Sequence, residues 1–141
     1  MSKTEMTLRT FWQPTSKVHR LVVCIYVIAF LVATCNHLRD LVDGGILPYS
    51  RVWGVPLWMN IYWTGLTLLD PMSVMALLLN VRLGMMCYYL IMVSDVSINW
   101  YAEIKYWKQP ILDSYGLLLQ TVFLVFLVVT SIRIYISRKM D

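Results

Sequence analysis

Four long apolar segments constrain this chain more than any other feature of its sequence. They run over residues 21–38, 53–69, 72–94 and 111–136. Crossing the hydrocarbon core of a bilayer takes roughly 20 mostly apolar residues in a helix, and a segment in lipid has to satisfy its backbone hydrogen bonds internally. The sequence therefore predicts an all-α integral membrane protein with four transmembrane helices in an antiparallel bundle.

The composition supports this class and leaves little material outside the bilayer. The chain is 59% hydrophobic and 14% charged, whereas soluble domains are roughly half apolar and a quarter charged. We therefore expect a single membrane domain over residues 1–141, with cytoplasmic tails at 1–20 and 137–141. The sequence contains no nucleic-acid-binding motif, so the net charge of +4 is attributed to topology and to contact with anionic membrane lipid.

Two of the connections between spans carry recognisable signals. Asp70 can cap a helix and Pro71 suits the first position of one, so this pair predicts a tight turn between the second and third spans. In the third connection, Trp100, Ile104 and Trp107 fall on one helical face. This spacing predicts a short interfacial helix between the third and fourth spans.

The orientation of the chain follows from its lysines and arginines near the span ends. The two tails and the adjoining end of the fourth span, which holds Arg133, carry seven such residues, and the first and third connections carry four. This bias predicts that both termini are cytoplasmic, in a bacterial inner membrane or an equivalent one. In an alternative interpretation the first segment is a signal sequence, because VATC, ending at Cys35, is close to a lipid-attachment box. Thr34 stands where that box has Gly, Ala or Ser, so we expect the segment to remain as an anchor.

Arg82 raises the sharpest question about function. With a turn at Asp70 and Pro71, it lies inside an apolar run, level with Asn60 on the preceding span. Polar residues at this depth predict a mid-membrane belt that binds a ligand or a partner: Asn60, Asn80, Arg82, Gln120 and Tyr62. A charge at the membrane centre costs at least about 2.5–3.5 kcal/mol, and the predicted turn leaves no acid of the chain within its reach.

Four explanations for Arg82 stay open. Its guanidinium can donate to the amide oxygens of Asn60 and Gln120, which would be a purely structural arrangement. It can meet an acid from another subunit, or bind an anionic lipid or ligand. It can also extend to the cytoplasmic interface if the third span begins deeper than predicted.

A second group of polar residues gathers near the outer membrane surface. His37 and Asp40 close the first span, Asp95 follows the third and Asp113 opens the fourth. Carboxylates and an imidazole at one level can coordinate a divalent metal or carry out proton chemistry. These residues are also common helix caps and interfacial residues, so they are weak catalytic candidates, and we predict no metal site.

Cysteines and histidines give no clear cofactor signal, and the cofactor stays unknown. Cys24, Cys35 and Cys87 form no C-x-x-C pair, which argues against a thiol oxidoreductase. His19 and His37 lie about 27 Å apart by helical rise. One chain therefore cannot hold a haem between them, although two copies can.

Three functions remain after these observations. The favoured one is an accessory, assembly or immunity-type subunit that binds another membrane protein, because Arg82 has no acid in its own chain. The second is a transporter or a small-molecule- or lipid-binding bundle that uses the belt, as a homo-oligomer. The third is a membrane-embedded enzyme that uses the outer-side His and Asp residues, although no known catalytic motif favours an enzyme.

Overall fold

A computed structural model describes residues 17–108, 110 and 113–140, and this part of the chain contains helices and no strand. The helices are α2 (Lys17–Gly44), α3 (Pro48–Trp53), α4 (Leu57–Leu79), α5 (Val81–Ala102), the π-helix η1 (Glu103–Trp107) and α6 (Tyr115–Met140). Four segments are long and apolar enough to cross a membrane: Arg20–Gly44, Leu57–Leu79, Val81–Trp107 and Tyr115–Ile132. The prediction of an all-helical chain with four potential membrane spans is confirmed.

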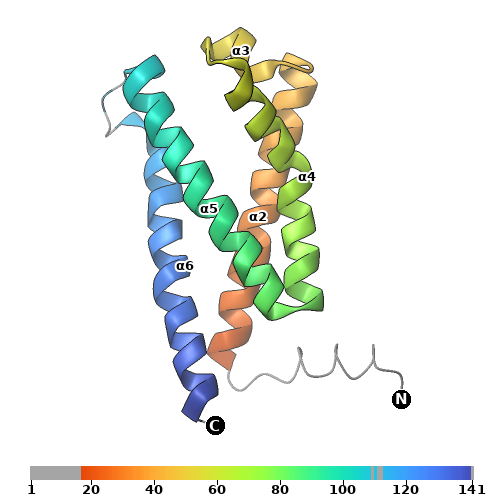
Figure 1. Cartoon of the computed structure of the whole chain (residues 1–141), viewed down its shortest axis with the longest axis vertical. Helices are drawn as coiled ribbons and strands as arrows, with labels where there is room; N and C mark the ends of the chain where they lie inside the picture. The colour runs from red at the N-terminus through yellow and green to blue at the C-terminus, as the bar shows by residue number, and fades with distance from the viewer. Residues whose placement is uncertain (1–16, 109, 111–112, 141) are drawn as a thin grey trace.

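The four long helices lie lengthwise along the molecule (Figure 1). The start of α2, the turn between α4 and α5 and the end of α6 share one end, which we call the turn end. The opposite end, which we call the loop end, holds α3, η1 and the start of α6. Pro48 begins α3, and Gly54 ends it with a left-handed φ of 64° that glycine adopts without strain.

The turn between the second and third spans lies at Asn80, so its predicted position at Asp70 and Pro71 is wrong. Helix α4 continues through both residues to Leu79. Asn80 then adopts an extended conformation, and its side chain accepts a hydrogen bond from the Leu83 amide at 3.2 Å, which caps α5. The boundaries predicted for both spans change with it. Proline is tolerated inside a transmembrane helix, because neighbouring groups can satisfy the carbonyl that it leaves free.

The region predicted as a separate interfacial helix is a continuation of α5. The helix runs to Ala102 and passes directly into η1, so Trp100, Ile104 and Trp107 all belong to one continuous helical segment. This segment ends at Lys108, which has a left-handed φ of 52°. The short helix beside the spans is instead α3, in the first connection.

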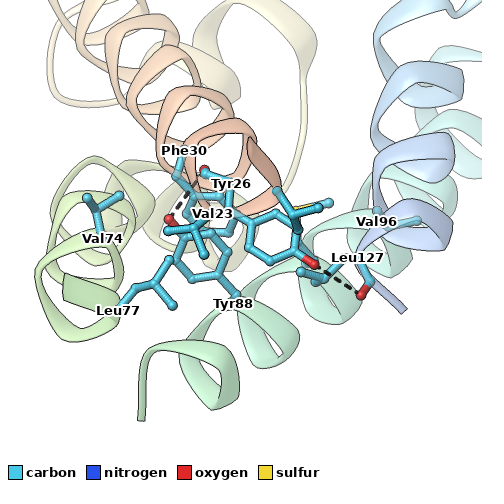
Figure 2. Packing of buried hydrophobic residues seen from close by; sticks show 10 residues of the cluster. Val23, Tyr26, Phe30, Val74, Leu77, Tyr88, Val96 and Leu127 are labelled. Carbon is cyan, nitrogen blue, oxygen red and sulfur yellow. Dashed lines mark hydrogen bonds between the residues drawn. The ribbon is translucent and has the colours of Figure 1, made fainter. Parts of the chain in front are cut away.

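An apolar and aromatic cluster joins all four long helices (Figure 2). Phe30 on α2 stacks on Tyr88 on α5, with ring centroids 3.8 Å apart. The Tyr88 hydroxyl donates to the Tyr26 carbonyl at 3.3 Å, and the Tyr26 hydroxyl donates to the Leu127 carbonyl on α6 at 3.4 Å. We call this cluster the apolar core. Its buried hydroxyls all find acceptors on neighbouring helices.

Helices α4 and α5 approach most closely beside their turn. A Cβ atom at Gly84 would collide with the backbone of Leu77, so only glycine permits this contact. The two helices diverge from there, and α5 leans toward α6 at the loop end (Figure 1). The fold is therefore tight at the turn end, and its loop end has room for polar side chains.

Candidate ligand-binding site

The structure does not bring the five residues of the predicted belt together. Arg82 is exposed in the first turn of α5, and Asn80 forms the adjacent turn, both at the turn end. Asn60 and Gln120 lie toward the loop end, where each makes its own hydrogen bonds. The Tyr62 hydroxyl bonds with the Ser94 hydroxyl at 2.6 Å, between α4 and α5. Arg82 consequently needs no buried acid, because the shift of the turn from Pro71 to Asn80 moves it out of the apolar interior.

Asn60 serves to attach α3 to α4. Its side-chain oxygen accepts from the backbone amides of Tyr49 and Ser50 at 3.0 and 3.2 Å. Its amide nitrogen donates to the Ile46 carbonyl at 3.3 Å. Since Asn60 is almost fully buried, these bonds fix Tyr49 in position above the helices.

The weak candidates from the outer side, in contrast, line one cavity at the loop end. This cavity has a volume of about 630 Å³, and its lining includes His37, Asp40, Asp95 and Asp113. Its lining residues range from the buried Asp95 to the exposed Asn36 and Asp113. The cavity therefore reaches from the helix interior to the surface. Sequence reasoning found these four residues from their common membrane level.

Aromatic rings form one wall of the cavity. Trp63 on α4 and Trp107 on η1 stack with centroids 6.1 Å apart and an interplanar angle of 21°. Trp53 meets Trp107 edge-on at 5.3 Å, and Tyr49 lies 5.1 Å from Trp63. Sequence reasoning missed Trp53 and Trp63 as site residues, because aromatic residues near span ends are usually membrane anchors.

Two buried acids face these rings. Asp95 and Glu103 are only 6% and 4% exposed. The Gln120 amide nitrogen donates to one oxygen of Asp95 at 3.2 Å, and Asn99 donates to the Gln120 oxygen at 2.8 Å. The other Asp95 oxygen and one Glu103 oxygen have no hydrogen-bond partner within the described chain. Glu103 was not predicted as a site residue, because it was placed in an interfacial helix.

Unpartnered polar atoms are concentrated around this cavity. Besides the two carboxylate oxygens, the indole nitrogens of Trp63 and Trp107 are buried without a hydrogen bond of regular geometry in the described chain. All four of these residues line the cavity. The Trp63 indole and the Asn99 side chain nevertheless lie close enough to the Asp95 carboxylate to interact with it. Buried polar groups in native proteins are nearly always hydrogen-bonded, so each exception calls for an explanation. A ligand or water in the cavity would supply one.

A series of linked polar side chains runs from Asp40, which lines the cavity, to Asp70, which lies outside its lining. The Tyr49 hydroxyl donates to Asp40 at 3.0 Å and lies 2.9 Å from His37 Nδ1. His37 Nε2 lies 3.9 Å from the carboxylate of Asp70, which is 2% exposed. Burial raises the pKa of the Tyr49 hydroxyl above its ordinary value and the Asp40 carboxylate raises it further, so Tyr49 stays neutral. Asp70 was missed as a functional residue because it was assigned to a turn.

Charge gives the cavity its chemical character. Its described lining residues include four carboxyl groups and one imidazole, and none of them is a lysine or an arginine. Within the described residues, no three His, Cys, Asp or Glu side chains lie close enough to hold a metal ion. The site is thus an acidic, aromatic cavity in a helical chain with four potential membrane spans. Comparison of the chain with protein-family models, with curated proteins and with solved structures found no match.

Proposed function

We propose that this protein is an integral membrane protein of the ligand-binding or transport class, and that its cavity binds an organic cation. One observation carries the proposal: Asp95 and Glu103 line a cavity walled by indole rings, and each keeps a buried carboxylate oxygen without a hydrogen-bond partner in the described chain. A buried carboxylate without a cationic partner is costly. A bound cation would remove that cost, and removal of the ligand would restore it.

The aromatic wall favours a cation with an apolar body. A cation over the face of an indole ring gains about 0.5–2 kcal/mol, more when water is excluded. Trp63 and Trp107 are stacked beside the two acids, so charge and apolar surface would be recognised together. The volume of about 630 Å³ falls within the usual range of about 300–1,000 Å³ for small-molecule pockets. Anions would be repelled by the same carboxylates.

The proposed topology is an antiparallel bundle with both termini in the cytoplasm and the cavity on the outer side. Arg82 supports this orientation, because it lies at the same end of the molecule as Lys17 and Arg20. It thus adds to the seven lysines and arginines that lie in the two tails or, as Arg133 does, at the adjoining end of the fourth span. The turn end would face the cytoplasm, and the loop end would face the opposite compartment.

The accessory-subunit prediction loses the argument on which it was based. That argument required Arg82 to be buried without an acid, and Arg82 is exposed at the start of α5. A membrane-protein partner or a homo-oligomer remains a prediction. The enzyme alternative uses the same His37, Asp40, Asp95 and Asp113, which here serve as binding groups.

Tetraphenylphosphonium is a suitable probe, because it carries one charge inside an apolar shell and forms no hydrogen bonds. We expect saturable binding to the purified protein in lipid nanodiscs, measured by equilibrium dialysis and by quenching of tryptophan fluorescence. Asp95→Asn keeps the shape of the side chain and removes its charge, so it should weaken binding at least about tenfold, equivalent to about 1.4 kcal/mol.

Asp43→Asn is the matched control. Asp43 is an exposed acid near the same end of α2, paired with Arg39 at 3.4 Å, and it does not line the cavity. Its substitution should leave probe binding unchanged. The neutral compound triphenylphosphine oxide should compete poorly. Binding that is non-saturable, or equally strong for the anion tetraphenylborate, would contradict the proposal.

A further inference from the structure

We propose that Asp70 is a proton-binding carboxyl deep between the helices, and that Asp40, Tyr49 and His37 form the path along which its proton exchanges with the loop end. This inference concerns a second ligand, the proton, and does not depend on the organic cation. It rests on the order and spacing of four side chains from three elements: α2, α3 and α4.

The path begins near the surface and ends in the interior. Asp40 is partly exposed, whereas the side chain of Asp70 is 3% exposed. Successive separations are 3.0 Å from Asp40 to the Tyr49 hydroxyl, 2.9 Å from there to His37 Nδ1, and 3.9 Å from His37 Nε2 to Asp70. The first two are hydrogen-bond distances. The third has to shorten, by rotation of the His37 or Asp70 side chain, when a proton passes.

Hydrogen-bond roles place a proton in the inner pair. Tyr49 donates its hydrogen to Asp40, so its oxygen is free to accept from His37 Nδ1–H. In that tautomer Nε2, which faces Asp70, carries no hydrogen. An ionised Asp70 would then be a buried charge without a donor, which is costly. A proton therefore has to reside either on Nε2, facing the carboxylate, or on Asp70 itself. In both cases the His37–Asp70 pair holds one exchangeable proton.

No fixed cation takes the place of this proton. The ionisable groups around Asp70 are His37 on α2, Tyr49 on α3, Tyr62 on α4, and Tyr88 and Asp95 on α5. Within the described residues, the ion pairs are His37 with Asp70 and Arg39 with Asp43. A lysine or arginine beside Asp70 would neutralise it permanently. With a histidine there, neutralisation depends on proton uptake.

Pro71 leaves hydrogen-bond acceptors beside Asp70. Proline has no amide hydrogen, so the Thr67 carbonyl lacks its regular helical donor. The Thr67 hydroxyl oxygen is also buried without a partner within the described chain. Residues three apart are neighbours on a helix, so a protonated Asp70 has acceptors on its own helix as well as His37 Nε2. The site is therefore suited to the neutral acid as well as to the carboxylate.

The net transfer is balanced by one proton. In the hydrogen-bond arrangement described, Asp70 gives its proton to His37 Nε2, His37 Nδ1 gives its hydrogen to the Tyr49 oxygen, and Tyr49 gives its own hydrogen to the Asp40 carboxylate. Uptake follows the same steps in reverse, from the arrangement in which Tyr49 donates to His37 Nδ1 and His37 carries its hydrogen on Nε2. Both intermediates return to their neutral forms, so no other reactant is needed. His37 also lines the cavity, which places the path directly beside the proposed cation site.

Infrared difference spectroscopy in lipid nanodiscs tests the proposal. We expect a C=O stretching band of a protonated carboxylic acid that appears on acidification, disappears in Asp70→Asn and persists in Asp95→Asn. After transfer into D₂O, Tyr49→Phe should slow the isotope shift of this band at least about tenfold, because it removes the middle hydroxyl. Tyr62→Phe is the control, since Tyr62 is a half-buried tyrosine that bonds to Ser94, off the path.

Each outcome decides the proposal. Absence of an Asp70-dependent band, or exchange in Tyr49→Phe as fast as in the unaltered protein, would overturn it. If Asp70→Asn does not accumulate, Asp70→Glu should shift the band instead of removing it. Tetraphenylphosphonium should still bind to Asp70→Asn, because Asp70 does not line the cavity. If the unaltered protein shows the Asp70-dependent band but does not bind the probe, only the cation site is contradicted. If it binds the probe but shows no such band, only the proton path is contradicted.

Discussion

The same helices build an apolar core toward the turn end and a cavity at the loop end, and the two regions differ in how their polar atoms are satisfied. In the apolar core, the hydroxyls of Tyr26 and Tyr88 donate to carbonyls of neighbouring helices. At the cavity, Trp63, Asp95 and Glu103 each keep a buried polar atom without a partner in the described chain. Natural chains depart from complete satisfaction mainly at functional sites. This contrast, more than the residue types alone, separates the site from the scaffold.

Phe30→Ala tests the strongest claim of the comparison, that stability comes from the apolar core. Phe30 is 2% exposed and stacks on Tyr88. Phe→Ala changes in soluble cores cost about 3–5 kcal/mol, and we expect the lower value, about 3 kcal/mol, because lipid tails are as apolar as the core. Thermal unfolding in detergent measures the loss.

Trp107→Ala is the counterpart at the cavity. It should lower the affinity for tetraphenylphosphonium and reduce the melting temperature by less than Phe30→Ala does. Equal thermal losses in the two variants would mean that the loop end is part of the core, and the comparison would fail.

Gly84→Ala should have the next largest effect. The added Cβ would meet the backbone of Leu77, so α4 and α5 would have to separate beside their turn. Overpacking costs typically 1–3 kcal/mol, and we expect about this loss of stability in the same unfolding measurement. Gly65→Ala is the matched control, because a Cβ there meets nothing within 4 Å. It should gain up to about 1 kcal/mol from helix propensity, and a similar loss at both glycines would refute the close-contact argument.

Arg82→Gln should have the smallest effect. Arg82 is exposed in the first turn of α5, and exposed substitutions usually change stability by less than about 0.5 kcal/mol. Native mass spectrometry of gently extracted protein should show the same composition for the variant and the unaltered chain. Loss of a stoichiometric second protein in the variant alone would restore the accessory-subunit function.

The sequence predicted the class of fold because lipid imposes a length on every apolar helix. It also predicted that His37, Asp40, Asp95 and Asp113 lie near one membrane level, and the structure places them around one cavity. The position of the second turn could not be predicted in the same way. Asp70-Pro71 is a strong stop signal for helices in water, whereas α4 continues through it, as an apolar helix of membrane-spanning length can. The N-cap at Asn80 was the signal that could have corrected this.

That one error determined the errors about Arg82 and Asp70. Moving the turn from Pro71 to Asn80 carries Arg82 out of the apolar interior and brings Asp70 into it. The predicted belt depended on the depth assigned to each residue, and these depths were wrong, so the structure does not contain the belt. Glu103 and Trp107 were missed for a different reason. They were placed in a separate interfacial helix, whereas they belong to a π-helical continuation of α5 that lines the cavity.

The π-helix η1 bears on how relatives of this chain would have to be compared. Its last bond, from the Lys108 amide to the Glu103 carbonyl at 2.7 Å, spans one residue more than a regular helical turn. The π-turn accommodates one extra residue in the helix, so deletion of a single residue between Glu103 and Trp107 would restore regular helical hydrogen bonds and leave the flanking residues close to their present positions. In an alignment of relatives, a one-residue gap at this place would therefore be compatible with a retained cavity wall. Trp107 would have to be matched across the gap and not by its count from Glu103.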